Sequence, residues 1–199
     1  LAASRRPGIA FLILDKGAAV TVEEQELQRV EYGLRAAKLT ESQIAEALAY
    51  TKLVFHVAYG GEGWPELVAA TNEARARKWA ETVQLVETEN DLEGWRQQRF
   101  DPAPILRRTK IPVLALFGGN DTLVPPAGNA ERMRGYFEEA GNGDVTIRIF
   151  PAQGHSRFLG QSLKGDRWEW PDRYWIWDKQ APEFEETVIS WLTMRLGLE

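Results

Sequence analysis

Short apolar runs alternate with longer amphipathic stretches along this chain of 199 residues. Three of the runs, at 9–14, 113–117 and 145–150, are rich in Ile, Val, Leu and Phe and end at Asp15, at a Gly-Gly pair and at Pro151. Runs of this length and composition are typical of strands in a parallel sheet that is covered on both faces. The pattern therefore predicts an α/β fold, with about three parallel strands near these positions and flanking helices.

Helical periodicity fills the sequence between the first two predicted strands. Thr21 and Thr40 are each followed three residues later by Glu or Gln, the pattern of a capping box at the start of a helix. Apolar residues then recur every three or four positions, as on one face of an amphipathic helix. A long exposed helix is predicted over 66–89, which is rich in Ala, Glu, Arg and Lys, and a shorter helix is predicted over 90–99.

The order of these elements predicts two structural parts. Residues 1–20 and 101–199 are expected to form the α/β core, and residues 21–100 a helical insertion between two of its strands. The segment 101–104 contains two prolines and is expected to be a stiff, non-helical return to the core, because proline fixes φ and disfavours helix. A C-terminal helix that begins at Pro182 should cover one face of the sheet.

An acid and a histidine follow the second and third predicted strands. Asp121 stands just beyond strand 113–117, a helix is expected over 127–140, and His155 comes after strand 145–150. In a right-handed crossover the loops after neighbouring parallel strands share one edge of the sheet. An acid hydrogen-bonded to imidazole fixes its tautomer and stabilises its protonated form, so these residues are candidates for two members of a catalytic triad. The alternative is that Gly-Asn-Asp is ordinary turn chemistry and that the histidine has no chemical role.

The sequence around this pair resembles that of a known superfamily. The stretches FDPAPILRRTKIPVLALFGGNDTLVPP and RIFPAQGHSRF are similar to the C-terminal half of an α/β-hydrolase, nearest to the esterase, thioesterase and acyl-peptidase-like members with a helical cap. The resemblance implies that Asp121 is the acid and His155 the base of a serine hydrolase. It also implies a cap at 21–100 and a small-molecule ester, thioester or peptide substrate, with no cofactor.

The chain departs from that family in one large respect, because it contains no G-x-S-x-G motif and no cysteine. None of its serines lies in a strand-to-helix elbow with flanking glycines, including Ser156, which adjoins His155. The nucleophile is therefore expected outside this chain, before residue 1, and the chain alone is expected to be inactive. Strand 9–14 would then have an exposed edge, which predicts association with a missing N-terminal half or with a second copy.

Two other functions are compatible with the same residues. The chain can be a non-enzymatic hydrolase remnant that binds a ligand or a partner, because a fold does not imply an activity. Asp121 and His155 can also activate a water directly, although no electrophilic helper is visible for that reaction. An in-frame G-x-S-x-G upstream of Leu1 would favour the hydrolase, and a start codon there would favour the binding module. Asp15, at the same sheet edge, is a further candidate, although a solvated acid at a strand end is the more common case.

Composition narrows the choice of partners. The formal charge of −5 and the absence of a basic run argue against nucleic acid and anionic membranes as partners, and no apolar stretch is long enough to span a bilayer. Two histidines and no cysteine make a metal site unlikely, and His56 is interpreted as a helix-end histidine. The lack of cysteine is compatible with a cytoplasmic location.

An aromatic-rich segment follows His155. The sequence RWEWPDRYWIWDK contains half of the eight tryptophans of the chain. Dense aromatic residues mixed with charge suit a pocket rim or a protein interface, and they also suit a loop folded against the core. The spacing does not decide between these interpretations.

Overall fold

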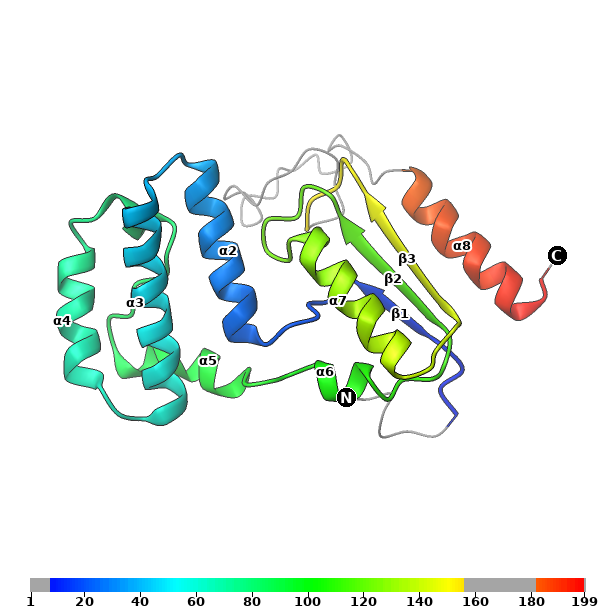
Figure 1. Cartoon of the computed structure of the whole chain (residues 1–199), viewed down its shortest axis with the longest axis horizontal. Helices are drawn as coiled ribbons and strands as arrows, with labels where there is room; N and C mark the ends of the chain where they lie inside the picture. Colours follow the sequence, from blue (N-terminus) through cyan, green and yellow to red (C-terminus); the bar gives the residue numbers. More distant parts are fainter. Residues whose placement is uncertain (1–7, 156–181, 199) are drawn as a thin grey trace, which may run out of the picture. The chain divides into compact units, whose positions relative to one another are not determined.

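The computed structural model describes residues 8–155 and 182–198, in two compact units. Unit 1 comprises Leu1–Ala19 and Pro102–Glu199, and unit 2 comprises Val20–Asp101. The division lies next to the boundaries expected from the sequence. The elements of unit 1, labelled in Figure 1, are β1 (Leu12–Asp15), α6 (Ala103–Leu106), β2 (Val113–Gly118), α7 (Pro126–Glu139), β3 (Val145–Phe150) and α8 (Pro182–Leu196).

Unit 1 is built on a three-stranded parallel sheet in the order β1-β2-β3. The prediction of an α/β fold with three parallel strands and flanking helices is confirmed. β2 is the central strand, and all of its residues are buried. β1 begins at Leu12 rather than at Ile9, because its pairing starts where the Leu12 N–H donates to the Pro112 carbonyl and the β2 register opens at Val113.

α7 covers one face of the sheet (Figure 1), and α8 packs against the other. Side chains on successive strand residues point to opposite faces, so β2 contributes to two separate cores. Ala115 and Phe117 pack with Phe137 of α7, whereas Leu114 and Leu116 pack with α8. The continuous apolar sequence of β2 is therefore explained by burial on both faces.

The C-terminal end of α8 is tied to the loop before β3. The Arg195 guanidinium donates hydrogen bonds to both carboxylate oxygens of Asp144 and lies over the Trp191 ring, 4.7 Å from its centroid. These hydrogen bonds lower the pKa of the Asp144 carboxyl below its ordinary value, because they favour the ionised form.

Replacing Asp144 with asparagine should lower the free energy of unfolding at pH 7 by less than about 1 kcal/mol, because about half of the Asp144 side chain is exposed and solvent screens the pair. A carboxyl whose pKa is lower in the folded state contributes stability above its unfolded pKa of about 3.9, and this contribution is lost as pH falls through the folded value. Urea unfolding at several pH values between 7 and 2.5 should therefore show the wild-type advantage disappearing below about pH 4. A difference that stays constant to pH 2.5 would show that the pair does not act through the Asp144 charge.

Unit 2 is helical. Its elements are α2 (Val22–Ala36), α3 (Glu41–Gly60), α4 (Trp64–Ala74), the 3₁₀ turns η1 (Lys78–Glu81) and η2 (Glu89–Leu92), and α5 (Glu93–Gln97). Thr21 and Thr40 cap α2 and α3 as predicted, since each side chain accepts a hydrogen bond from the main-chain N–H three residues later. A buried hydroxyl, that of Tyr50, bonds both the Thr71 hydroxyl and the Val86 N–H and so ties three segments together.

The predicted long helix over 66–89 is wrong. α4 ends at Ala74, and the chain turns so that Trp79, Val83 and Val86 are buried in the core of unit 2. The Trp79 ring lies 5.6 Å from that of Tyr50. The charged composition of this stretch favoured a long exposed helix, but the burial of these three residues required the helix to end.

The predicted non-helical return at 101–104 is also wrong. α6 begins at Ala103, with Pro102 as its cap and Pro104 in its first turn. Proline is compatible with the first turn of a helix because the N–H that it lacks would have no intrahelical partner there. The prediction treated both prolines as if they lay in a helix interior.

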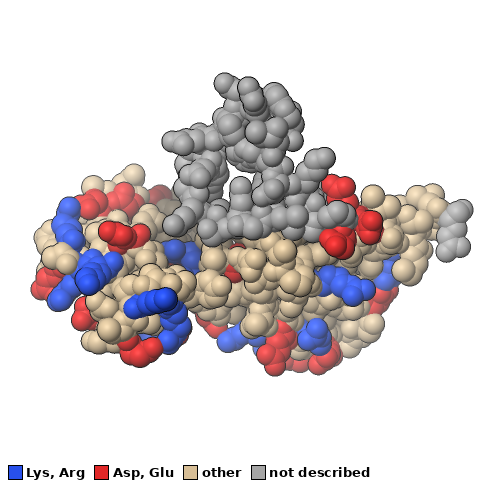
Figure 2. Space-filling view, turned by 90° about the horizontal axis from the view of Figure 1, so that it is seen from above, with Lys and Arg blue, Asp and Glu red and all other residues tan. Residues whose placement is uncertain are grey.

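Charged side chains are distributed over the surface of each unit. Figure 2 shows Lys and Arg interspersed with Asp and Glu on the visible face, where neither sign forms a continuous patch of described residues. Exposed pairs such as Arg35 with Glu41 and Arg107 with Glu139 belong to this pattern. None of the helices within 8–155 and 182–198 has both the length and the apolar composition needed to cross a membrane.

Candidate functional site

Asp121 lies on the loop that leaves the C-terminal end of β2. Its carboxylate is fully buried, and its Oδ1 accepts hydrogen bonds from the main-chain N–H groups of Leu123 and Val124, both at 2.9 Å. An Asp side chain that bonds main-chain groups two and three residues ahead forms a local turn. The same two bonds satisfy part of the buried carboxylate and hold it in one orientation.

The imidazole of His155 occupies the other side of that carboxylate. Its Nδ1 lies 2.9 Å from Asp121 Oδ2, within the hydrogen-bond distance expected from the sequence. An ionised carboxylate can only accept hydrogen bonds. Nδ1 therefore carries the proton and donates a hydrogen bond to Oδ2. Nε2 then keeps its lone pair, and about a third of the histidine side chain is exposed to solvent. The arrangement can take up a proton at Nε2 while the acid stabilises the resulting positive charge.

Two hydrogen bonds join the loop of Asp121 to the loop of His155. The Gly119 N–H donates to the Phe150 carbonyl, and the Asn120 N–H donates to the Gln153 carbonyl, both at 2.8 Å. The β2–β3 ladder is thus continued past the ends of the strands. The distance between the acid and the base is set mainly by main-chain contacts.

Two glycines allow this close approach. A Cβ added to Gly118 would lie 2.5 Å from the Gln153 carbonyl oxygen, and one added to Gly119 would lie 2.6 Å from the Pro151 main chain. Real Cβ atoms do not approach other main-chain atoms so closely. The place where the two loops pass this close to each other, here called the glycine crossing, therefore requires glycine at both positions. From the sequence alone, this Gly-Gly pair indicated only the end of a strand. A glycine pair at a strand end, two residues before a candidate acid, was the signal that could have shown its role.

The end of β1 carries the other acidic candidate. Asp15 Oδ1 accepts a hydrogen bond from Lys16 Nζ at 3.0 Å. Lys16 is buried, adopts a left-handed backbone with φ +53°, and lies 5.1 Å from the centroid of the Phe184 ring. Asp15 is therefore an ion-paired residue rather than the solvated acid considered from the sequence, which gave no indication of the buried lysine.

The structure describes two of the five serines. Ser42 lies in the first turn of α3 and Ser190 in α8, both exposed and neither at a strand-to-helix turn. Ser4, Ser156 and Ser162 lie outside the described residues. The aromatic segment that contains Trp168, Trp170, Tyr174, Trp175 and Trp177 lies outside them as well.

The second histidine is remote in sequence from the pair and belongs to unit 2. His56 is exposed on α3, close to the C-terminal end of that helix. Within the part of the chain that the structure describes, no three His, Asp or Glu side chains are grouped as they would be around a metal ion.

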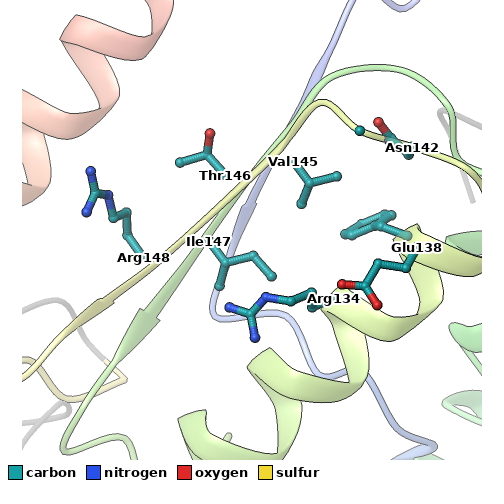
Figure 3. A pocket seen from close by; sticks show the side chains of 9 residues that line it. Arg134, Glu138, Asn142, Val145, Thr146, Ile147 and Arg148 are labelled. Atoms are coloured by element: carbon teal, nitrogen blue, oxygen red, sulfur yellow. The ribbon is translucent and has the colours of Figure 1, made fainter.

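A depression of about 510 Å³ lies between α7 and β3 (Figure 3). Figure 3 shows Arg134 and Glu138 of α7 beside Ile147 of β3, while Arg148 extends on the opposite side of the strand. Its strand residues, 145–148, belong to the first part of β3, whereas the histidine follows the end of that strand. The depression is therefore separate from the acid and base.

Comparison of the chain with protein-family models, with curated proteins and with solved structures found no match. A buried acid hydrogen-bonded to an accessible imidazole, at the carboxyl edge of a parallel sheet, is an arrangement suited to general acid–base chemistry.

Proposed function

We propose that this chain supplies the acid and the base of a serine-type hydrolase that cleaves an ester, thioester or peptide by acyl transfer. The observation that carries the proposal is the 2.9 Å hydrogen bond between Asp121 Oδ2 and His155 Nδ1. The order of strand, acid, helix, strand and histidine, and the resemblance of both loops to those of α/β-hydrolases, support it.

The roles of the two residues follow from their geometry. His155 Nε2 would accept the proton of an attacking hydroxyl and later return it to the leaving group. Asp121 would hold the imidazole in the required tautomer and stabilise its positive charge. The two main-chain N–H groups that bond Oδ1 leave Oδ2 free for the histidine, so the acid would not need to reorient during the reaction.

The hydroxyl nucleophile would come from a segment beside β1. Within the described residues β1 pairs only with β2, and Ile13 on β1 is 37% exposed although the strand is apolar in sequence. β3, the opposite edge strand, also carries an exposed isoleucine, Ile149, but places the charged Arg148 beside it, and charged residues are common on strand edges that face water. A strand parallel to β1 would carry the residue after its C-terminal end to the sheet edge where the acid and base lie.

Labelling with a fluorophosphonate probe tests the proposal. The purified 199-residue chain should not be labelled, because Ser42 and Ser190 are exposed helix residues and neither lies at a strand-to-helix turn. The same chain expressed with the coding sequence that precedes Leu1 should be labelled once, at a serine in that added sequence. Stoichiometric labelling of the 199-residue chain, for example at Ser156, would place the nucleophile elsewhere. No labelling of either form, together with no hydrolysis of esters, thioesters or peptides, would favour the non-enzymatic binding module.

A further inference from the structure

Gln153 has an unusual environment for a polar side chain. It is completely buried, and neither its Oε1 nor its Nε2 has a hydrogen-bond partner among the residues that the structure describes. Buried amides in proteins are almost always hydrogen-bonded, because an unpaired polar group loses its contacts with water and gains nothing in return. A side chain in this situation indicates a partner that is not part of the described protein.

Two other buried amides in unit 1 show the usual arrangement. Asn129 accepts from the Ala19 N–H at 2.8 Å and donates to the Pro125 carbonyl at 2.9 Å. Asn142 donates to the main-chain carbonyls of two residues and accepts from the Asp144 N–H. The fold therefore satisfies buried amides where main-chain groups are within reach. Gln153 is an exception to this pattern.

The position of Gln153 connects it to the acid–base pair. Its main-chain carbonyl accepts from the Asn120 N–H on the loop of Asp121, and its N–H donates to the Phe150 carbonyl at the end of β3. It precedes His155 by two residues. A partner that fixes the Gln153 side chain would thus restrain the segment that joins β3 to the histidine.

The chemistry of an amide selects the partner. Oε1 needs a donor and Nε2 needs an acceptor, so a carboxylate or a cation could satisfy only one of them. Water offers both functions and is small enough for a closed interior, where internal waters typically make about three hydrogen bonds to otherwise unpaired polar groups.

We infer that Gln153 holds one or two internal water molecules and thereby acts as a positioning residue for His155. The positioning role rests on the proposed function of His155, whereas the water site does not. The inferred water would lie beside the side-chain amide of Gln153, which is completely buried.

Magnetic relaxation dispersion of ¹⁷O water tests the site directly, because it counts water molecules that remain in a protein for longer than its tumbling time. Wild-type chain should hold one or two more such molecules than the Gln153→Met variant, whose side chain is similar in size and apolar. The matched control is Gln97→Met, because Gln97 is exposed on α5 and bonds only Glu93 there. An equal count in wild type and Gln153→Met would overturn the water site.

The positioning role has its own readout in the NMR signal of the His155 Nδ1 proton. Gln153→Met should shift this signal and speed its exchange with solvent, and Gln97→Met should leave it unchanged. Gln153→Glu should restore the wild-type signal at acidic pH, where the neutral carboxyl is again both donor and acceptor, and lose it at higher pH. An unchanged His155 signal in Gln153→Met despite a lost water would overturn the positioning role. None of these measurements needs hydrolytic activity, so their failure is distinguishable from failure of the proposed function.

Discussion

Replacing His155 with alanine should abolish turnover in the proposed hydrolase, assayed as this chain together with a segment that supplies the nucleophile. Loss of the base from a catalytic triad lowers kcat by a factor on the order of 10⁶. The reason here is that His155, which is hydrogen-bonded to Asp121 at 2.9 Å, is the proposed base. Asp121→Asn should reduce kcat by about 10⁴-fold, since an amide that donates to Nδ1 would favour the wrong imidazole tautomer.

His56→Ala is the matched control for this experiment. His56 is the only other histidine in the chain, and it is exposed on α3 in unit 2. Its replacement should leave kcat/KM within about a factor of two of the wild type, because surface substitutions rarely disturb a fold. Equal losses in His56→Ala and His155→Ala would indicate general destabilisation. Full activity in His155→Ala would remove His155 from the mechanism.

The second large effect is expected at the glycine crossing. Gly118→Ala should lower the free energy of unfolding by about 3 kcal/mol, because its Cβ would lie 2.5 Å and 2.7 Å from the main-chain oxygens of Gln153 and Gly154. The clash involves main-chain atoms, which cannot move aside as a flexible side chain can. Displacement of the His155 loop would relieve the clash. It would also lengthen the hydrogen bond between His155 and Asp121.

Urea unfolding and the His155 Nδ1 proton signal measure these two consequences separately. Gly135→Ala provides the control, since Gly135 lies within α7 and a Cβ there meets nothing within 4 Å. That substitution should raise stability by about 0.5–1 kcal/mol, because alanine is the better helix former. Wild-type stability together with an unchanged histidine signal in Gly118→Ala would show that the crossing does not position the pair.

The contacts that position Asp121 and His155 differ from the groups that would transfer the proton. Asp121 is oriented by main-chain N–H groups of its own loop, and His155 by the hydrogen-bonded crossing of the two loops. Substitutions at the glycine crossing should therefore act by displacing the pair and by changing the stability of the fold. Asp121→Asn, in contrast, retains an acceptor for the Leu123 and Val124 N–H groups. Its effect should fall mainly on proton transfer.

The sequence by itself determined the features that depend on local patterns. The apolar runs of β2 and β3 predicted strands because burial on a sheet requires apolar residues at those positions. The threonine caps of α2 and α3 were readable because a cap involves residues only three positions apart. The contact between Asp121 and His155 was predictable because neighbouring parallel strands place their following loops at one edge of the sheet.

The tertiary structure decided the features that depend on residues far apart in the sequence. α4 ends at Ala74 because Trp79 packs against Tyr50. No local pattern in the charged stretch that follows Ala74 shows that contact. The need for glycine at Gly118 comes from the main chain of Gln153, which crosses over the end of β2. Local patterns specify where strands and helices begin, because propensities and caps act over a few residues. Long-range packing specifies where an element must stop and which side chains become buried, since burial depends on which segments meet in the folded chain.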